Sequence, residues 1–146
     1  MEASLQNLLP YEVVDKLCQR IEQFLVDCGG IYKSVTGLMT MNIMEALVTR
    51  NFVIKIDKTG DIRYFACYWK IHPEDLEAVK ERYRPYDTIT GSIVYVAEMG
   101  NKEGRQGIKE ISRQIREKAK GCQGVFWHRP AKEDKVYYFP SQKGIE

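Results

Sequence analysis

The amino-acid sequence predicts an α+β fold in which a single mixed, mostly antiparallel sheet is flanked by helices. Two β-branched and aromatic runs, at 51–57 and 62–71, are joined by a short turn and are typical of a β-hairpin. A strand pattern, a helical pattern and another strand pattern follow over 92–128. That alternation requires a crossover helix between neighbouring strands, so the sheet cannot be purely antiparallel.

Length and composition favour one domain with an ordinary hydrophobic core. The chain has 146 residues, of which 44% are hydrophobic, and a chain of this length supports a core without metal or disulfide bonds. We therefore expect 1–146 to be a single domain, with a lead-in at 1–9 and a flexible tail at 140–146. The net charge of +2 and the pI of about 8.3 disfavour a dedicated nucleic-acid module.

The cysteines and the hydropathy pattern predict a cytoplasmic protein without a metal site. No cysteine pair has C-x-x-C spacing, and no histidine follows at zinc-ligand spacing. Cys18 and Cys67 occupy apolar positions, where a free thiol behaves as a small hydrophobic side chain. No signal peptide pattern opens the chain, and no apolar run approaches the roughly 20 residues that span a bilayer.

Helical periodicity opens the predicted fold. Apolar residues recur at helical spacing over 10–28, and the pair Gly29-Gly30 ends that helix. These apolar residues are Val14, Leu17, Cys18, Ile21, Leu25 and Cys28. A second helix is expected over 37–49. We expect both helices to cover the sheet.

The second strand of the hairpin has two apolar faces. Strand alternation places Tyr64 and Tyr68 on one face, and Phe65, Cys67 and Trp69 on the other. A central strand that is covered on both sides explains this pattern without any base-stacking role.

A helix over 73–83 should follow the hairpin, because Pro73 suits a first turn and acidic residues come next. Its apolar face would consist of Leu76, Val79 and Tyr83.

The last part of the chain is expected to contain a strand at 92–99, a loop at 100–104, a helix at 105–119, and strands at 124–128 and 135–139. The first of these strands is apolar almost throughout, which favours burial on both faces. The helix is rich in Lys and Arg, so it is the most probable surface for an anionic ligand or partner by charge.

The loop before that helix is the segment most suggestive of chemistry. A helix N-terminus presents unpaired backbone N–H groups and partial positive charge, both of which suit a phosphate or pyrophosphate. Gly100, Gly104 and Gly107 would let the backbone approach the ligand, and Lys102 and Arg105 would add charge-assisted contacts. The alternative is a tight strand-to-helix turn followed by a solvated basic face.

This order of elements resembles the GNAT acyltransferase fold from about residue 10 to residue 139. The resemblance implies an acyl-CoA donor, such as acetyl-CoA, whose pantetheine arm pairs with the central strand at Val96, Ala97 and Met99. It also implies that the loop at 100–107 binds the pyrophosphate. The family pattern has Gln or Arg, two residues, Gly, one residue, and Gly or Ala. The segment 101–106 keeps only its first glycine, and Gly107 falls one residue late.

The arrangement is also similar to the toxin-activating lysine acyltransferases, which resemble a GNAT core and use acyl carrier protein as donor. That similarity implies a protein lysine or an amine-bearing small molecule as acceptor. Those enzymes rely on a histidine near the N-terminus and an aspartate on the central strand. Here no histidine occurs in the first 71 residues, and Tyr95 stands where the aspartate would. The similarity is therefore one of architecture.

Three residues are candidates for the chemistry of acyl transfer, which needs a base, an oxyanion donor and an acid for the departing thiolate. Glu98 ends an apolar strand, where desolvation would raise its pKa toward neutrality and suit it to be the base. His128 is a second candidate base, and Tyr138 is a candidate acid. The simpler alternatives are a solvent-facing Glu98, an edge-strand His128 and a core Tyr138.

The sequence leaves three functions open. The first is acyl transfer to an amine, the second is a non-catalytic binding or assembly module of the same architecture, and the third is a nucleic-acid-associated protein that uses the basic helix at 105–120. The small net charge counts against the third.

Overall fold

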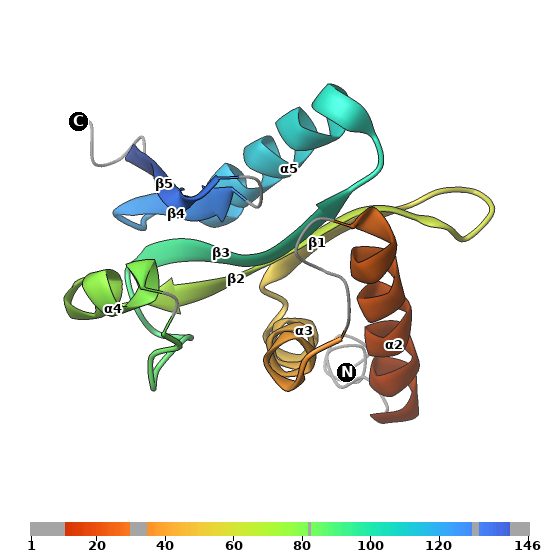
Figure 1. Ribbon diagram of the computed structural model, residues 1–146, viewed down its shortest axis with the longest axis horizontal. Coiled ribbons are helices and arrows are strands. Elements are labelled where there is room, and N and C mark those ends of the chain that lie inside the picture. The colour runs from red at the N-terminus through yellow and green to blue at the C-terminus, as the bar shows by residue number, and fades with distance from the viewer. Residues whose placement is uncertain (1–10, 30–34, 82, 130–131, 141–146) are drawn as a thin grey trace, which may run out of the picture.

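One five-stranded sheet organises the chain, and helices cover it on both faces (Figure 1). The computed structural model describes residues 11–29, 35–81, 83–129 and 132–140, with side chains described up to Trp127. The elements in order are α2 (Tyr11–Cys28), α3 (Gly37–Thr49), β1 (Phe52–Ile56), β2 (Ile62–Ile71), the 3-10 turn η1 (Pro73–Asp75), α4 (Leu76–Lys80), β3 (Ile93–Asn101), α5 (Gly104–Lys118), β4 (Gly124–Arg129) and β5 (Lys132–Pro140).

The strands lie in sequence order, and one of the four pairings is parallel. β1 and β2 pair antiparallel, as do β2 with β3 and β4 with β5, whereas β3 and β4 run parallel. The helix α5 makes the crossover that this parallel pair requires. The predicted α+β class and the mixed, mostly antiparallel sheet flanked by helices are confirmed.

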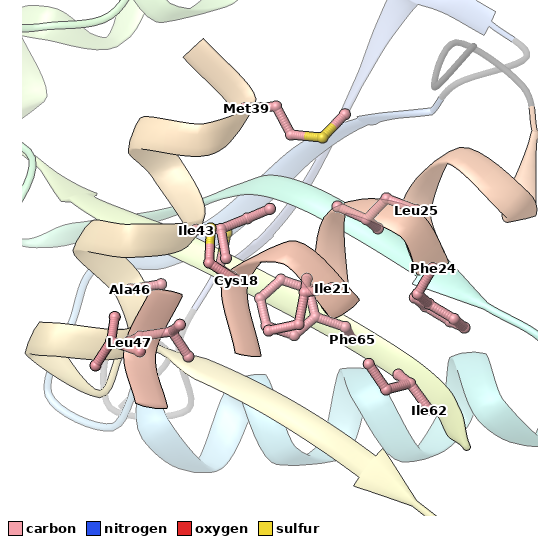
Figure 2. Close-up of a cluster of buried hydrophobic side chains, with 12 residues drawn as sticks. Cys18, Ile21, Phe24, Leu25, Met39, Ile43, Ala46, Leu47, Ile62 and Phe65 are labelled. Atoms are coloured by element: carbon pink, nitrogen blue, oxygen red, sulfur yellow. The ribbon is translucent and has the colours of Figure 1, made fainter. Parts of the chain in front are cut away.

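Helices α2 and α3 cover one face of the sheet. Ile21 and Leu25 of α2 and Ile43 of α3 pack over Phe65 of β2, and all four side chains are almost completely buried (Figure 2). Helix α3 has the bounds that its periodicity predicted, and α2 ends where predicted, at Cys28, whereas the expected first residue, 10, lies outside the described residues. Helix α3 begins after Thr36, whose Oγ1 accepts a hydrogen bond of 3.0 Å from the Met39 backbone N–H.

Helix α5 covers the opposite face. Its Ile111 and Ile115 belong to a second cluster that includes Tyr64 and Tyr68 of β2 and Val94 of β3. The side chains of β2 therefore alternate between the two helical layers, as the sequence predicted. Burial raises the pKa of the Tyr68 hydroxyl to about 12, which fits a role in packing rather than in proton transfer.

The helix expected over 73–83 is shorter than the sequence suggested. Helix α4 ends at Lys80, and Tyr83 lies beyond it with 69% of its surface exposed. The segment that follows turns toward α3, where Glu45 accepts hydrogen bonds from Arg84 Nη2 at 2.9 Å and from Thr88 Oγ1 at 2.7 Å. These tertiary contacts draw the chain away from the helical path.

β3 extends beyond its expected end, and β5 begins before its expected start. β3 continues to Asn101, because Gly100 and Asn101 still pair with β2. The expected loop at 100–104 is therefore reduced to the residues just before α5. β5 begins at Lys132, whereas the sequence predicted a strand only from residue 135. Of the expected lead-in and tail, residues 1–9 and 141–146 lie outside the described part of the chain.

The two buried thiols agree with the sequence-based expectation for them. The pKa of Cys18 is raised to about 12, mainly by burial, and burial also raises that of Cys67 well above the ordinary range. Both thiols thus stay protonated and inert. Within the described ranges, none of the helices has the length and apolar character needed to cross a lipid bilayer.

Candidate functional site

The two parallel strands part soon after they meet. β3 and β4 pair only over Ile93–Tyr95 and Gly124–Phe126, although both strands continue beyond these residues. In Figure 1, β4 and β5 lie beside the part of β3 nearest α4, and β3 continues past them toward the start of α5. The chain therefore contains a parallel pair that diverges next to the middle of β3.

A β-bulge lies at the point of divergence. Cys67 of β2 pairs with Glu98, whereas Tyr68 pairs with Val96, so Ala97 is the extra residue on β3. Without this insertion, alternation would place Glu98 on the same face as Val96, beneath α5. With it, Glu98 faces α3, and Met99 returns to the cluster beneath α5.

Glu98 is held in a buried polar cluster rather than facing solvent. Its side chain is 8% exposed, and its Oε2 accepts a hydrogen bond of 2.8 Å from Asn42 Nδ2 on α3. Asn42 Oδ1 in turn accepts a hydrogen bond of 3.1 Å from Trp69 Nε1. Residues from α3, β2 and β3 thus meet beside the bulge.

Aromatic and charged groups extend this cluster in two directions. Trp69 packs against Tyr95 at 5.2 Å between ring centroids, and Tyr95 packs against Phe126 at 5.0 Å, which leads toward the parting strands. On its other side, the Trp69 ring lies 5.7 Å from the guanidinium of Arg84. The aromatic row links the buried carboxylate to both β4 and the segment after α4.

The turn that leads into α5 is closed by its own side chains. Asn101 Oδ1 accepts a hydrogen bond of 2.9 Å from the Glu103 N–H, and Asn101 Nδ2 donates one of 2.8 Å to the Gly104 carbonyl. Glu103 then forms ion pairs with Arg63 at 2.7 Å and Lys55 at 3.1 Å. Hydrogen bonds from Arg63 and then Lys55 lower the pKa of Glu103, so it is ionised at neutral pH.

Two of the three glycines near this turn have packing reasons to be glycine. A Cβ at Gly100 would lie 2.8 Å from Leu25 Cδ2, and a Cβ at Gly107 would lie 2.0 Å from Asn101 Oδ1. Close packing against the side chains of α2 and of Asn101 therefore accounts for both glycines without a ligand. Gly104 differs, because its φ of +63° places it in the left-handed region, with open space around the missing Cβ.

The outer surface of α5 is strongly basic. Arg105, Lys109 and Arg113 are exposed at four-residue spacing, so their side chains follow one line along the helix. Glu110 faces the sheet instead, 4.0 Å from Lys55 Nζ. In the described part of the chain, none of those three cations forms a salt bridge.

A surface hollow of about 360 Å³ borders the turn at Lys102, on the α2 side. Lys102 Nζ lies 5.4 Å from the Phe24 ring centroid, so its charge is directed toward α2. The residues that line the hollow are Arg20, Gln23, Phe24, Asp27, Asp61, Ile62, Arg63 and Lys102. Two carboxylates accompany its three cations, which makes it a mixed site rather than an anion pocket.

The predicted site residues fall into two groups. Val96, Ala97, Glu98 and Met99 lie at the bulge, whereas Gly100, Lys102, Gly104, Arg105 and Gly107 lie at the end of β3 and the start of α5. The side chains of His128 and Tyr138 lie outside those that the structure describes, although their backbones pair in β4 and β5.

Sequence reasoning missed Asn42, Trp69 and Arg84 as parts of the site. An asparagine at helical spacing among the apolar residues of α3 was the one available signal, and it is only a weak indication.

Comparison with known proteins adds no family assignment. A scan of protein-family models and a search of curated proteins both find no match to this chain. Among the described residues, no three His, Cys, Asp or Glu side chains gather in a way that would hold a metal ion.

Proposed function

We propose that this chain is a GNAT-like acyltransferase that moves an acyl group from acyl-CoA, or from acyl carrier protein, to an amine. The acceptor is an amine-bearing small molecule or a protein lysine. The single observation that carries the proposal is the parting of the parallel strands β3 and β4 after Tyr95 and Phe126, beside the buried carboxylate of Glu98. A donor arm could enter where the ladder ends, and a base would then stand next to it.

The chemistry follows from that arrangement. Glu98 takes a proton from the acceptor amine as its nitrogen attacks the thioester carbonyl. Backbone N–H groups near the bulge stabilise the oxyanion, because a bulge takes a residue out of the regular ladder. The C–S bond then breaks, and the departing thiolate is protonated. Tyr138 is the proposed acid for this step.

The donor's phosphates are assigned to the start of α5. The helix N-terminus supplies backbone N–H groups, and Lys102 and Arg105 are exposed on either side of Gly104. These features support the assignment, and the open space beside Gly104 is compatible with a close backbone approach.

One specific observation favours the second candidate function, a non-catalytic module of the same architecture. The carboxylate of Glu103 already lies at the N-terminus of α5, and the Asn101 side chain fills the turn. An anionic carrier would have to bind beside a negative charge, which is unfavourable. Within the first function, an acyl carrier protein that docks on the basic face of α5 would avoid that conflict.

Ligand binding separates these functions directly. Titration calorimetry and thermal shift of the full chain with acetyl-CoA, a long-chain acyl-CoA and acyl carrier protein should show binding to at least one donor. The same donors, offered with a free amine, should yield an amide product that the Glu98→Gln variant fails to form. If neither binding nor product occurs with any of them, the non-catalytic function stands instead.

A matched pair of charge reversals tests the phosphate assignment. Arg105→Glu should weaken coenzyme A binding by about tenfold or more, since one charge-assisted contact contributes on the order of 1.5–3 kcal/mol. Lys118→Glu changes the charge equally but lies at the far end of α5, so it should leave the affinity within about twofold. Equal effects of the two variants would remove the start of α5 from the site.

A further inference from the structure

The amide of Asn42 has only one orientation that its neighbours allow. An indole N–H can donate a hydrogen bond but cannot accept one. Asn42 Oδ1 must therefore face Trp69 Nε1, 3.1 Å away, which turns Nδ2 toward Glu98 Oε2 at 2.8 Å. The oxygen and nitrogen of an asparagine amide are otherwise easily exchanged. Trp69 thus determines that Asn42 presents a donor, and not an acceptor, to the carboxyl group.

The position of Asn42 makes an asparagine costly there. It is 4% exposed, and the other buried residues of α3 are Met39, Ile43, Ala46 and Leu47. An apolar residue would continue that pattern and would suit a helix interior better. A buried amide is tolerated only when its hydrogen bonds are made. Here they are made to one carboxylate and to the indole that orients the amide.

We propose that Asn42 is a positioning residue for Glu98, with Trp69 as the group that orients it. This inference rests on the proposed function, in which Glu98 is the base. The bulge at Ala97 turns Glu98 toward α3, and Asn42 then fixes its Oε2 at one place beside the parting strands. The carboxylate is thereby held in one rotamer before the acceptor arrives, which is the preorganisation that proton transfer requires.

Three described ionisable groups lie around the cluster, and each has its own explanation. Cys67 on β2 and Cys18 on α2 have raised pKa values, first of all because they are buried, so both stay neutral. Glu45 on α3 is paired with Arg84 from the segment after α4, at 2.9 Å. The Asn42 amide donates a hydrogen bond to Glu98 that a neutral substitution can remove without touching these groups.

The first experiment needs no substrate. Carbon-13 NMR of the full chain, with Glu98 assigned by the Glu98→Gln variant, follows the titration of its side-chain carboxyl. Loss of the donor in Asn42→Leu should raise the midpoint, and Asn42→Asp should raise it further by adding a like charge. Trp69→Phe, which frees the amide to turn, should give a smaller rise and serves if the first two variants fold poorly.

Thr88→Val is the matched control, because Thr88 is another buried polar residue and its hydroxyl contacts Glu45 rather than Glu98. It should destabilise the protein and leave the Glu98 midpoint in place. If Asn42→Leu and Trp69→Phe lower the thermal midpoint of unfolding but leave the titration as it is in the wild type, Asn42 has only a packing role and the inference is overturned.

The second experiment measures acyl transfer with the donor that the wild type uses. Asn42→Leu should lower kcat by about tenfold or more at neutral pH, with KM for the donor within about twofold. The activity of Asn42→Leu should recover as pH rises, because the acid limb of the pH–rate profile follows the pKa of Glu98, which this variant is expected to raise. Absence of transfer by the wild type would overturn the proposed function. Transfer whose kcat and acid limb are unaffected by Asn42→Leu would overturn this inference alone.

Discussion

Gly91 lies against the backbone of β2, where no side chain can fit. A Cβ built at this position would be 1.9 Å from the Ile71 carbonyl carbon and 2.0 Å from its oxygen, and both belong to main chain that cannot rotate away. The Gly91 N–H also donates to the Lys70 carbonyl at 3.0 Å, which ties the segment to the strand. Gly91 therefore allows the chain after α4 to pack directly on β2.

We expect Gly91→Ala to lower the free energy of unfolding by at least about 3 kcal/mol, the upper part of the range for overpacking. Urea unfolding followed by circular dichroism measures it. Gly37→Ala is the control, because nothing lies within 4 Å of the missing Cβ at the start of α3 and its φ is not positive. A loss for Gly91→Ala no larger than that for Gly37→Ala would show that the segment packs elsewhere.

The pair His72 and Asp87 should make stability depend on pH. His72 Nε2 lies 2.8 Å from Asp87 Oδ2, and that hydrogen bond raises the pKa of His72. A group whose pKa is raised on folding contributes stability that is fully present below its unfolded pKa, here about 6.5. That contribution is lost as pH rises through the folded pKa. The difference in thermal midpoint between wild type and His72→Gln should therefore shrink as pH rises above about 6.5.

Asp87→Asn provides the control for this pair. Hydrogen bonds from Thr90, from the Ile89 N–H and from His72 lower the pKa of Asp87, so it is ionised throughout that range. Removing its charge should abolish the same pH dependence. A difference between wild type and His72→Gln that stays constant from pH 5 to alkaline pH would mean that the pair does not form in solution.

At the scale of the element, α5 separates its charges between two surfaces. Glu103 and Glu110 pair with Lys55 on the sheet side, whereas Arg105, Lys109 and Arg113 repeat at four-residue spacing on the outside. Like charges at that spacing destabilise a helix by a few tenths of a kcal/mol per pair. The free protein thus bears a small cost, which an acidic partner on this surface would relieve.

Lys109→Glu should therefore stabilise the protein, by about 1 kcal/mol at low salt. The change removes two repulsive pairs and creates two attractive ones, with Arg105 and Arg113. Urea unfolding measures the gain, which should largely disappear at ~1 M salt, where the Debye length is about 3 Å. Lys109→Gln should give roughly half of it. A gain that salt leaves unchanged would have a cause other than charge.

Over the whole molecule, periodicity predicted the layers but not the contacts between them. Helices α2 and α3 and the bounds of β2 follow from apolar spacing, because burial of one face imposes that spacing. The bulge at Ala97 leaves no such trace. Residues 93–97 are apolar almost throughout, so an inserted residue breaks no visible alternation, and the face on which Glu98 lies could not be predicted.

The candidate site shows the same division. Glu98 could be selected from sequence because a carboxylate follows an apolar run. Asn42 and Trp69 could not be linked to it, since they lie 56 and 29 positions away and meet it only through the packing of α3 on the sheet. The end of α4 at Lys80 was missed for a related reason, because Glu45 attracts Arg84 from across the fold.

The sheet should unfold as one cooperative unit, because β2 contributes side chains to all three clusters of the core. The chain's two tryptophans report on the opposite layers: Trp69 packs on the side of α4, and Trp127 packs against the cluster beneath α5. Loss of either layer would expose apolar residues of β2, so neither should persist alone.

We expect Trp69→Phe and Trp127→Phe each to show a urea midpoint by fluorescence that coincides with its own midpoint by far-UV circular dichroism. Midpoints that separate in either variant would divide the chain into more than one folding unit.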